Sequence, residues 1–210
     1  MKRSWVKTMS KGLLIVFSGP SGTGKGTVLS AYFAKHPEAQ FSVSATTRKP
    51  RPGEQDGREY YFVSREKFMQ MKQNNELLES AEYCGNCYGT PRAPIEKALK
   101  DGKDVFLDIE VQGGAQIRRL LPESVGVFIL PPSIQVLGER LRGRGTEAEE
   151  VVENRLTAAR REIPKAAEYD YAVVNDTVEK AAENLAAIVT AEKHKTSRNQ
   201  ALIERVLNHD

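Results

Sequence analysis

The sequence predicts an α/β fold with a central parallel sheet flanked by helices. Four apolar runs are continuous rather than alternating, which is typical of strands buried on both faces. These runs are Leu13–Phe17, Val105–Ile109, Val125–Leu130 and Tyr171–Val174. Helical patterns lie between them, and strands that alternate with helices indicate a parallel sheet.

Four helices are expected in this alternation. They cover Thr27–Lys35, Ile95–Lys100, Ser133–Leu141 and Val178–Val206. The second begins just after Pro94, a residue favoured in the first turn of a helix, and stops before Gly102. The last is the longest, and its apolar residues recur at helical spacing.

Residues 42–92 interrupt the alternation with turn signals and aromatic-rich stretches. Short strands are expected at Phe41–Ser44 and Tyr60–Val63. A small helix is expected to carry Phe68, Met71 and Leu77. This segment is interpreted as a compact inserted lobe of mixed α+β structure.

Residues 139–164 form a second interruption, which is rich in arginine and glycine. Thr146 and Glu149 have the spacing of a capping box, so a helix is expected to begin at Thr146. A basic, glycine-containing hinge followed by a helix is what a closing lid requires. The predicted organisation is a leader (1–10), a core (11–41, 93–138 and 165–210), the inserted lobe (42–92) and a helical lid (139–164).

The composition indicates a globular protein with one well-filled core. The chain has 210 residues, of which 40% are hydrophobic and 28% charged. Its net charge of +3 is too small to argue for a nucleic-acid partner, and no apolar run approaches the ~18 residues that span a bilayer. The apolar stretch after the basic leader is shorter than that of a signal peptide. A cytoplasmic protein without a membrane partner is therefore expected.

Cys84 and Cys87 form a single C-x-x-C pair. Such a pair can be a redox centre or half of a zinc site. No second pair exists, and the three histidines show no ligand spacing. Two thiols in a reducing compartment are the favoured interpretation.

A glycine-rich segment of the form G-x-x-x-x-G-K follows the first predicted strand. It consists of Gly19, Pro20, Ser21, Gly22, Thr23, Gly24 and Lys25. Its backbone N–H groups can surround phosphate oxygens, the following helix adds the positive end of its dipole, and the lysine adds a cation. The segment predicts a P-loop NTPase fold that binds a nucleoside triphosphate.

Two hydroxyl or carboxylate groups are candidates for the shell of a Mg²⁺ ion bound with ATP. Gly26 stands where the full motif has Ser or Thr, and Thr27 comes next. Asp108 ends a buried strand, where P-loop enzymes place a carboxylate that organises the metal. Contact through water is expected at both, and Glu110 shares a face with Asp108 if the strand continues. An alternative is that Asp108 only caps the next turn.

The basic stretch from Arg48 to Arg58 has two interpretations from the residues alone. It can bind a small phosphate group, or it can form part of a nucleic-acid surface. Glu54, Asp56 and Glu59 lie within it and cancel the field that a polyanion would feel, which disfavours the nucleic-acid surface.

Several motifs, in order, resemble the guanylate kinase family of bacterial type. They are Gly19–Thr27, Ser44–Glu54, Gly57–Val63, Gly85–Thr90, Leu107–Gly113 and Arg144–Glu147. The resemblance runs from about Lys11 to Ala191. It implies transfer of the γ-phosphoryl group of MgATP to GMP, and also to dGMP, in purine nucleotide metabolism.

The resemblance also implies a role for individual residues. The phosphate of GMP would be bound by Arg48, Arg51, Tyr60 and Tyr88. Guanine would be bound by Glu79 and by the hydroxyls of Ser44 and Thr90. Asp108 would also bind GMP. The catalytic residues that act on the transferring phosphates would be Lys25, Arg48, Arg140, Arg144 and Arg155. The adenine side would be bound by Asn175.

Two other functions stay open at this point. A guanylate-kinase-like binding module would be inactive, although such modules typically lack the loop or the lid arginines that this chain keeps. A related P-loop kinase would act on another acceptor, against which Glu79, Ser44 and Thr90 argue. The oligomeric state is also open, between a monomer and a homodimer or higher homo-oligomer.

Overall fold

The computed structural model describes residues 12–83, 85–143 and 148–208. These residues form two compact units. The first contains residues 12–18 and 38–126, and the second contains residues 19–37 and 127–208. The predicted leader, Cys84, Arg144 and Thr146 lie outside the described residues.

Three parallel strands form the centre of the first unit. They are β1 (Leu14–Ser18), β2 (Gln40–Phe41) and β7 (Val105–Asp108), and β7 lies between the other two. Every residue of β1 is buried, which explains its continuous apolar sequence. The helix α3 (Arg92–Lys100) packs on β7, and α4 (Val111–Leu120) packs on β1.

A second, four-stranded sheet belongs to the same unit. Its order is β4 (Tyr60–Phe62), β3 (Ser44–Thr46), β6 (Asn86–Pro91) and β5 (Leu77–Tyr83). The helix α2 (Arg65–Gln73) begins after Ser64, whose hydroxyl accepts a hydrogen bond from the backbone N–H of Lys67. A small core joins this helix to the sheet; it contains Ala45, Phe68, Met71, Leu77 and Cys87.

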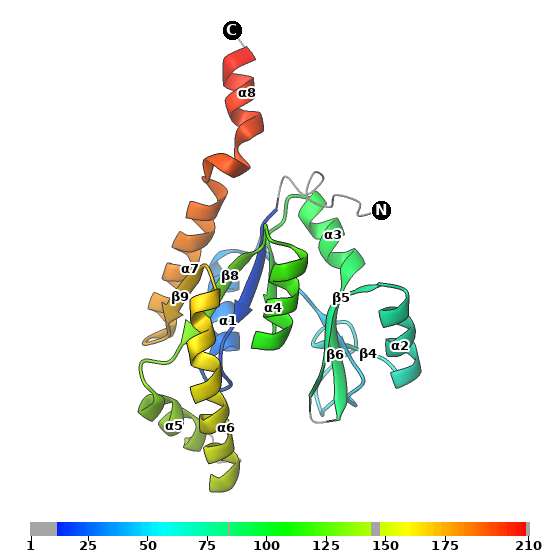
Figure 1. Cartoon of the computed structure of the whole chain (residues 1–210), viewed down its shortest axis with the longest axis vertical. Coiled ribbons are helices and arrows are strands. Elements are labelled where there is room, and N and C mark those ends of the chain that lie inside the picture. The colour runs from blue at the N-terminus through cyan, green and yellow to red at the C-terminus, as the bar shows by residue number, and fades with distance from the viewer. Residues whose placement is uncertain (1–11, 84, 144–147, 209–210) are drawn as a thin grey trace. The chain divides into compact units, whose positions relative to one another are not determined.

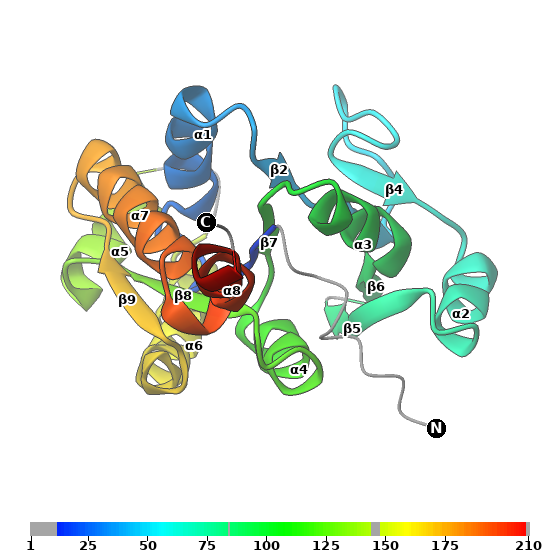
Figure 2. The ribbon, with the colours of Figure 1, turned by 90° about the horizontal axis from the view of Figure 1, so that it is seen from above.

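The second unit contains the parallel pair β8 (Val125–Leu130) and β9 (Tyr171–Val174). The helices α1 (Lys25–Lys35) and α7 (Val178–Lys193) lie side by side (Figure 2). The helices α5 (Ile134–Arg142) and α6 (Glu149–Glu162) pack through a separate apolar cluster (Figure 1). A 3₁₀ segment, η2 (Ile163–Glu168), leads from α6 to β9.

The predicted α/β fold is confirmed, with parallel strands of a central sheet flanked by helices. The four main strands lie within one residue of the predicted ranges. Two helices begin earlier than predicted: α1 begins at Lys25, and α3 begins at Arg92 and includes Pro94. Pro94 is compatible with this, because the N–H groups of a first turn have no partner within the helix.

The single strand predicted over Phe41–Ser44 is wrong. Its first part belongs to β2, which pairs with β7, and its last residue begins β3, which pairs with β4 and β6. Likewise, Leu77 does not extend the small helix but begins β5. Local apolar content cannot show that the chain leaves one sheet for another within two residues.

The continuous helix predicted over Val178–Val206 is also wrong. The helix α7 ends at Lys193, a short turn η3 (Thr196–Arg198) follows, and α8 (Gln200–Asn208) starts anew (Figure 1). The side-chain amide of Asn199 donates to the carbonyls of Lys193 and Lys195, which satisfies groups left at the helix end. These polar contacts favour a break that apolar spacing does not register.

The helix of the second interruption starts later than predicted. The helix α6 begins at Glu149, directly after Ala148, and Thr146 is outside the described residues. Over the described parts of the chain, no helix is both long and apolar enough to cross a membrane.

Candidate active site

The glycine-rich loop of the second unit turns sharply from strand to helix. Gly22 and Gly24 have φ values of 90° and 85°, a conformation that other residues rarely adopt. A Cβ atom at Gly22 would lie 2.7 Å from a methyl of Leu141, and one at Gly24 would lie 2.5 Å from Nδ2 of Asn175. The loop therefore needs glycine both for its conformation and for its close packing.

Lys25 is the first residue of α1, and its side chain returns over the loop. Its Nζ atom donates to the carbonyl of Gly19 at 2.8 Å and to that of Pro20 at 3.4 Å. The first N–H groups of α1 have no partner within the helix, so they and the lysine can bind an anion together. The Thr27 side chain is exposed in the same first turn.

Asn175 follows β9, and its side chain is hydrogen-bonded to the glycine-rich loop. Its Nδ2 atom donates to the carbonyl of Thr23 at 2.7 Å, and the residue is only 3% exposed. Its Oδ1 atom is buried and has no hydrogen-bond partner within the described parts of the chain. An amide oxygen without a donor is available to accept a hydrogen bond from a ligand.

Two of the three predicted phosphate-binding arginines can be placed in the second unit. Arg140 of α5 donates through Nη2 to the carbonyl of Asn175 at 2.9 Å, while its Nη1 is buried without an acceptor among the residues described. Arg155 lies on α6 and is partly buried. Arg142, which was not predicted to act, pairs instead with Glu149 and Glu153.

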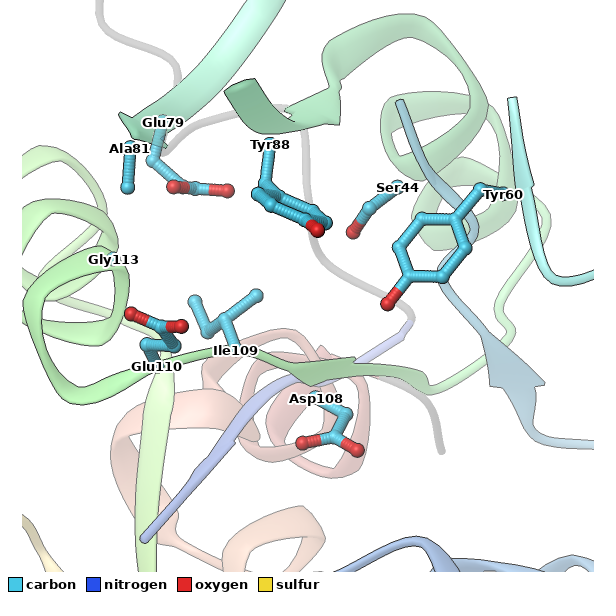
Figure 3. A pocket seen from close by; sticks show the side chains of 9 residues that line it. All are labelled: Ser44, Tyr60, Glu79, Ala81, Tyr88, Asp108, Ile109, Glu110 and Gly113. Atoms are coloured by element: carbon cyan, nitrogen blue, oxygen red, sulfur yellow. The ribbon is translucent and has the colours of Figure 1, made fainter. Parts of the chain in front are cut away.

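The first unit contains a cavity of about 240 Å³ (Figure 3). Five predicted site residues line it: Ser44, Tyr60, Glu79, Tyr88 and Asp108. They come from both sheets of the unit, on β3, β4, β5, β6 and β7. The tyrosine rings of the cavity are in edge contact, with centroids 6.0 Å apart. Residues far apart in sequence thus provide hydroxyls and carboxylates to one space.

Glu79 is the most buried acid of the cavity, with 8% of its surface exposed. Thr90 donates from Oγ1 to Oε1 of Glu79 at 2.6 Å, the short distance expected of a hydrogen bond to a carboxylate. Burial raises the pKa of Glu79 above its ordinary value, and the nearby Glu110 adds to this, while the hydrogen bond from Thr90 opposes it. Thr90 does not line the cavity and contacts it through Glu79.

Arg48 and Arg51, the predicted phosphate-binding arginines of the first unit, both contact the carboxylate of Glu54. Nη2 of Arg48 lies 2.8 Å from Oε1 of Glu54, and the backbone N–H of Arg51 donates to the other oxygen of Glu54 at 2.7 Å. These contacts lower the pKa of Glu54. The guanidinium of Arg48 also lies 5.3 Å from the ring centre of Tyr60, which places it beside the cavity, whereas the Arg51 side chain is exposed.

Four cavity residues were not predicted as site residues: Ala81, Ile109, Glu110 and Gly113. Glu110 was expected to share a face with Asp108 on a continuing strand. Instead β7 ends at Asp108, and Glu110 is the cap residue of α4, from which its carboxylate reaches the cavity (Figure 3). Glu110 is an acidic residue within the Leu107–Gly113 motif, and these two features could have identified it from the sequence as a site residue.

The described residues contain no group of three or more His, Cys, Asp or Glu side chains that could hold a metal ion. Mg²⁺ does not require such a group, because it typically keeps several waters and is held by one or two carboxylates plus substrate phosphates. Asp108 belongs to the first unit and Thr27 to the second, and contact of either group with Mg²⁺ through water stays a prediction. Cys87 is a buried free thiol.

Comparisons with known proteins point to one family. The family model described as guanylate kinase matches residues 11–192. A guanylate kinase of Desulfitobacterium hafniense is 53% identical over 165 residues, which cover 79% of this chain and 82% of that protein. A guanylate kinase of Listeria monocytogenes is 56% identical over 168 residues, which cover 79% of this chain and 82% of that protein.

A solved structure agrees with these sequence matches. The crystal structure of guanylate kinase from Anaplasma phagocytophilum superposes with a TM-score of 0.73 at 36% identity. The match covers 90% of each chain.

Proposed function

The chain belongs to the guanylate kinase family, and from this premise we propose which residues perform the family's reaction. In that reaction an oxygen of the GMP phosphate attacks the γ-phosphorus of ATP, and the bond from the γ-phosphorus to the β-bridging oxygen breaks. GDP and ADP are the products. The protein needs no covalent nucleophile, because positioning and neutralisation of charge supply the catalysis.

The cavity of the first unit is the proposed GMP site. The observation that carries this assignment is the buried carboxylate of Glu79, held by Thr90 at one end of a cavity lined with hydroxyls. Ionised, it can accept from N1–H and the 2-amino group of guanine, while the hydroxyl of Ser44 can donate to O6. Thr90 contributes by orienting Glu79, and Asp108 and Glu110 complete the acidic wall.

The GMP phosphate is assigned to Arg48, Arg51, Tyr60 and Tyr88. Guanidinium groups match phosphate oxygens in geometry and charge. In the structure Glu54 engages both arginine segments. We propose that it keeps them oriented before the phosphate arrives.

The second unit is the proposed ATP site. The loop from Gly19 to Lys25 binds the phosphates, and Arg140, Arg144 and Arg155 neutralise charge on the transferring group. Among the described residues, Nη1 of Arg140 and Oδ1 of Asn175 have no hydrogen-bond partner. This supports binding of an anion by the first and of the adenine amino group by the second. Mg²⁺ bound with ATP supplies further positive charge to the phosphates.

The finer features of the function are proposals as well. The groups assigned to GMP address its base and phosphate rather than its sugar, so dGMP is proposed as a second acceptor. The chain is proposed to act in the cytoplasm without nucleic-acid or membrane partners. A homodimer or higher homo-oligomer stays a prediction, which the molar mass in solution tests.

The first test is ADP production with MgATP and each of GMP, AMP, UMP and CMP. We expect turnover with GMP alone, because AMP offers a donor where guanine has O6 and lacks the 2-amino group. A Glu79→Gln variant should lose most of the preference for GMP over AMP. Turnover with another nucleotide, or unchanged selectivity in Glu79→Gln, would overturn the assigned base site.

A further inference from the structure

Gly113 is the third residue of α4 and is buried in the cavity wall. Glycine in a helix is less stable than alanine by about 0.5–1 kcal/mol. This glycine has a helical rather than a left-handed conformation, so backbone strain does not require it. The space around its Cα atom is therefore the feature to consider.

The missing side chain of Gly113 leaves room for the carboxylate of Glu79. A Cβ atom at Gly113 would lie 2.9 Å from Oε2 and 3.3 Å from Cδ of Glu79. Real Cβ atoms essentially never approach another heavy atom below 3.0 Å. The other oxygen of the same carboxylate is held by Thr90 at 2.6 Å. The carboxylate thus lies between a hydroxyl on β6 and bare backbone on α4.

We propose that Gly113 is a positioning residue for base selection, which rests on the role proposed above for Glu79. An added methyl would push the tip of the Glu79 side chain away from α4 and out of line with the hydroxyl of Thr90. Because the tip of a side chain can move while the backbone stays in place, the fold tolerates the change. Recognition of the N1–H and 2-amino groups of guanine is impaired by the same change, because it depends on the position of the Glu79 carboxylate.

The test is the Gly113→Ala variant of the full chain, assayed with GMP and with IMP, which lacks the 2-amino group. We expect KM for GMP to rise about tenfold or more, the size of one impaired hydrogen bond to a charged group. The preference for GMP over IMP should fall with it, while KM for ATP stays unchanged. A change that merely loosened the fold would not reduce this selectivity.

Gly126→Ala is the matched control. Its Cβ atom would lie 2.7 Å from Nε of Arg118, a residue of the same helix α4, and Gly126 does not line the cavity. The same methyl is therefore pressed against the same helix, but not against Glu79. We expect its KM for GMP and its selectivity to match the unchanged protein.

A double-mutant cycle with Glu79→Ala decides whether Gly113 acts through Glu79. If it does, Gly113→Ala adds no further loss of selectivity when Glu79 is absent. An equal loss in both backgrounds, or normal selectivity in Gly113→Ala alone, would overturn this inference. Normal selectivity in Glu79→Ala itself would instead overturn the proposed base site, so the two failures are distinguishable.

Discussion

Glu79 combines a functional need for negative charge with a place where charge is unfavourable. Burial and the neighbouring Glu110 raise its pKa, and the Thr90 hydroxyl limits that rise. Its raised pKa in the folded state means that the protonated form is favoured there more than in the unfolded chain. Ionised Glu79 thus lowers the free energy of unfolding at neutral pH, a cost that a guanine-reading acid incurs before its ligand arrives.

The first prediction concerns pH. Only ionised Glu79 can accept from both N1–H and the 2-amino group of guanine, so kcat/KM for GMP should fall as pH drops through its raised pKa. This acid limb should lie above the ordinary glutamate range of about 4.3–4.5. The measurement is the pH profile of kcat/KM for GMP, beside that of Glu79→Gln. Persistence of the same limb in the glutamine variant would assign it to another group.

The second prediction concerns Thr90. Thr90→Val keeps the shape but removes the hydroxyl that holds Glu79, and a hydrogen bond to a charged group contributes about 1.5–3 kcal/mol. We expect kcat/KM for GMP to fall about 10- to 100-fold, with the acid limb moved to higher pH. Thr90→Ser should restore most of the activity. If serine and valine behave alike, the hydroxyl is not the active feature.

At the scale of elements, the sequence predicted best where one local rule dominates. Buried strands such as Val125–Leu130 appear as continuous apolar runs, and the loop before Lys25 has a fixed spacing of glycines. The start of α5 is equally local. A helix was predicted from Ser133, and the structure shows that Ser133 caps it by accepting from the N–H of Val136. Five residues that line the cavity of the first unit were predicted from family motifs, since no local pattern brings Ser44 and Glu79 together.

The failures arose where distant contacts decide the structure. Glu192 sits near the end of α7 but is only 1% exposed, and it accepts a hydrogen bond from Tyr171 of β9 at 2.6 Å. Lys195 and Arg198, just beyond the helix, form ion pairs with the same carboxylate. The helical spacing of apolar residues predicts that α7 continues. That spacing contains no information about the contacts of the Glu192 carboxylate.

The third prediction tests that cluster. Glu192→Ala should lower the free energy of unfolding by about 2–4 kcal/mol. This is less than the loss typical of a fully buried ion pair, because Lys195 is half exposed. Although burial opposes it, bonds from Lys195 and Tyr171 leave the pKa of Glu192 lowered. Its contribution is thus present above the unfolded pKa and lost as pH falls through the folded one.

Denaturant unfolding of Glu183→Ala provides the comparison for Glu192→Ala. Glu183 lies on the same helix and pairs with Lys180 at 3.5 Å, but both side chains are more than half exposed. Such a pair contributes about 0–1 kcal/mol. Equal losses in the two variants would show that the buried cluster stabilises the fold no more than an exposed ion pair does.

At the scale of the whole molecule, the two substrates are assigned to different compact units. Every residue that lines the acceptor cavity falls between Ser44 and Gly113, in the first unit. The glycine-rich loop, Arg140, Arg155 and Asn175 all belong to the second. Reaction requires both sites. Binding of GMP, as proposed, uses only groups of the first unit, and Lys25 is not among them. Binding and turnover should therefore be separable by mutation.

The fourth prediction follows from this division. Lys25→Ala removes the cation of the loop, and loss of one preorganised charge-stabilising group typically lowers kcat by about 10²–10³. Binding of GMP should be unaffected, because Lys25 contributes nothing to the acceptor cavity. Its Kd, measured by calorimetry without ATP, should equal that of the unchanged protein.

Thermal unfolding gives an independent measure of the same separation. A ligand at 100 times its Kd stabilises a protein by about 2.7 kcal/mol, so GMP should raise the Tm of both proteins equally. ATP should raise the Tm of the unchanged protein more than that of Lys25→Ala. If the variant instead lost its response to GMP, the acceptor site would depend on the phosphate loop, and the assignment of one substrate to each unit would be wrong.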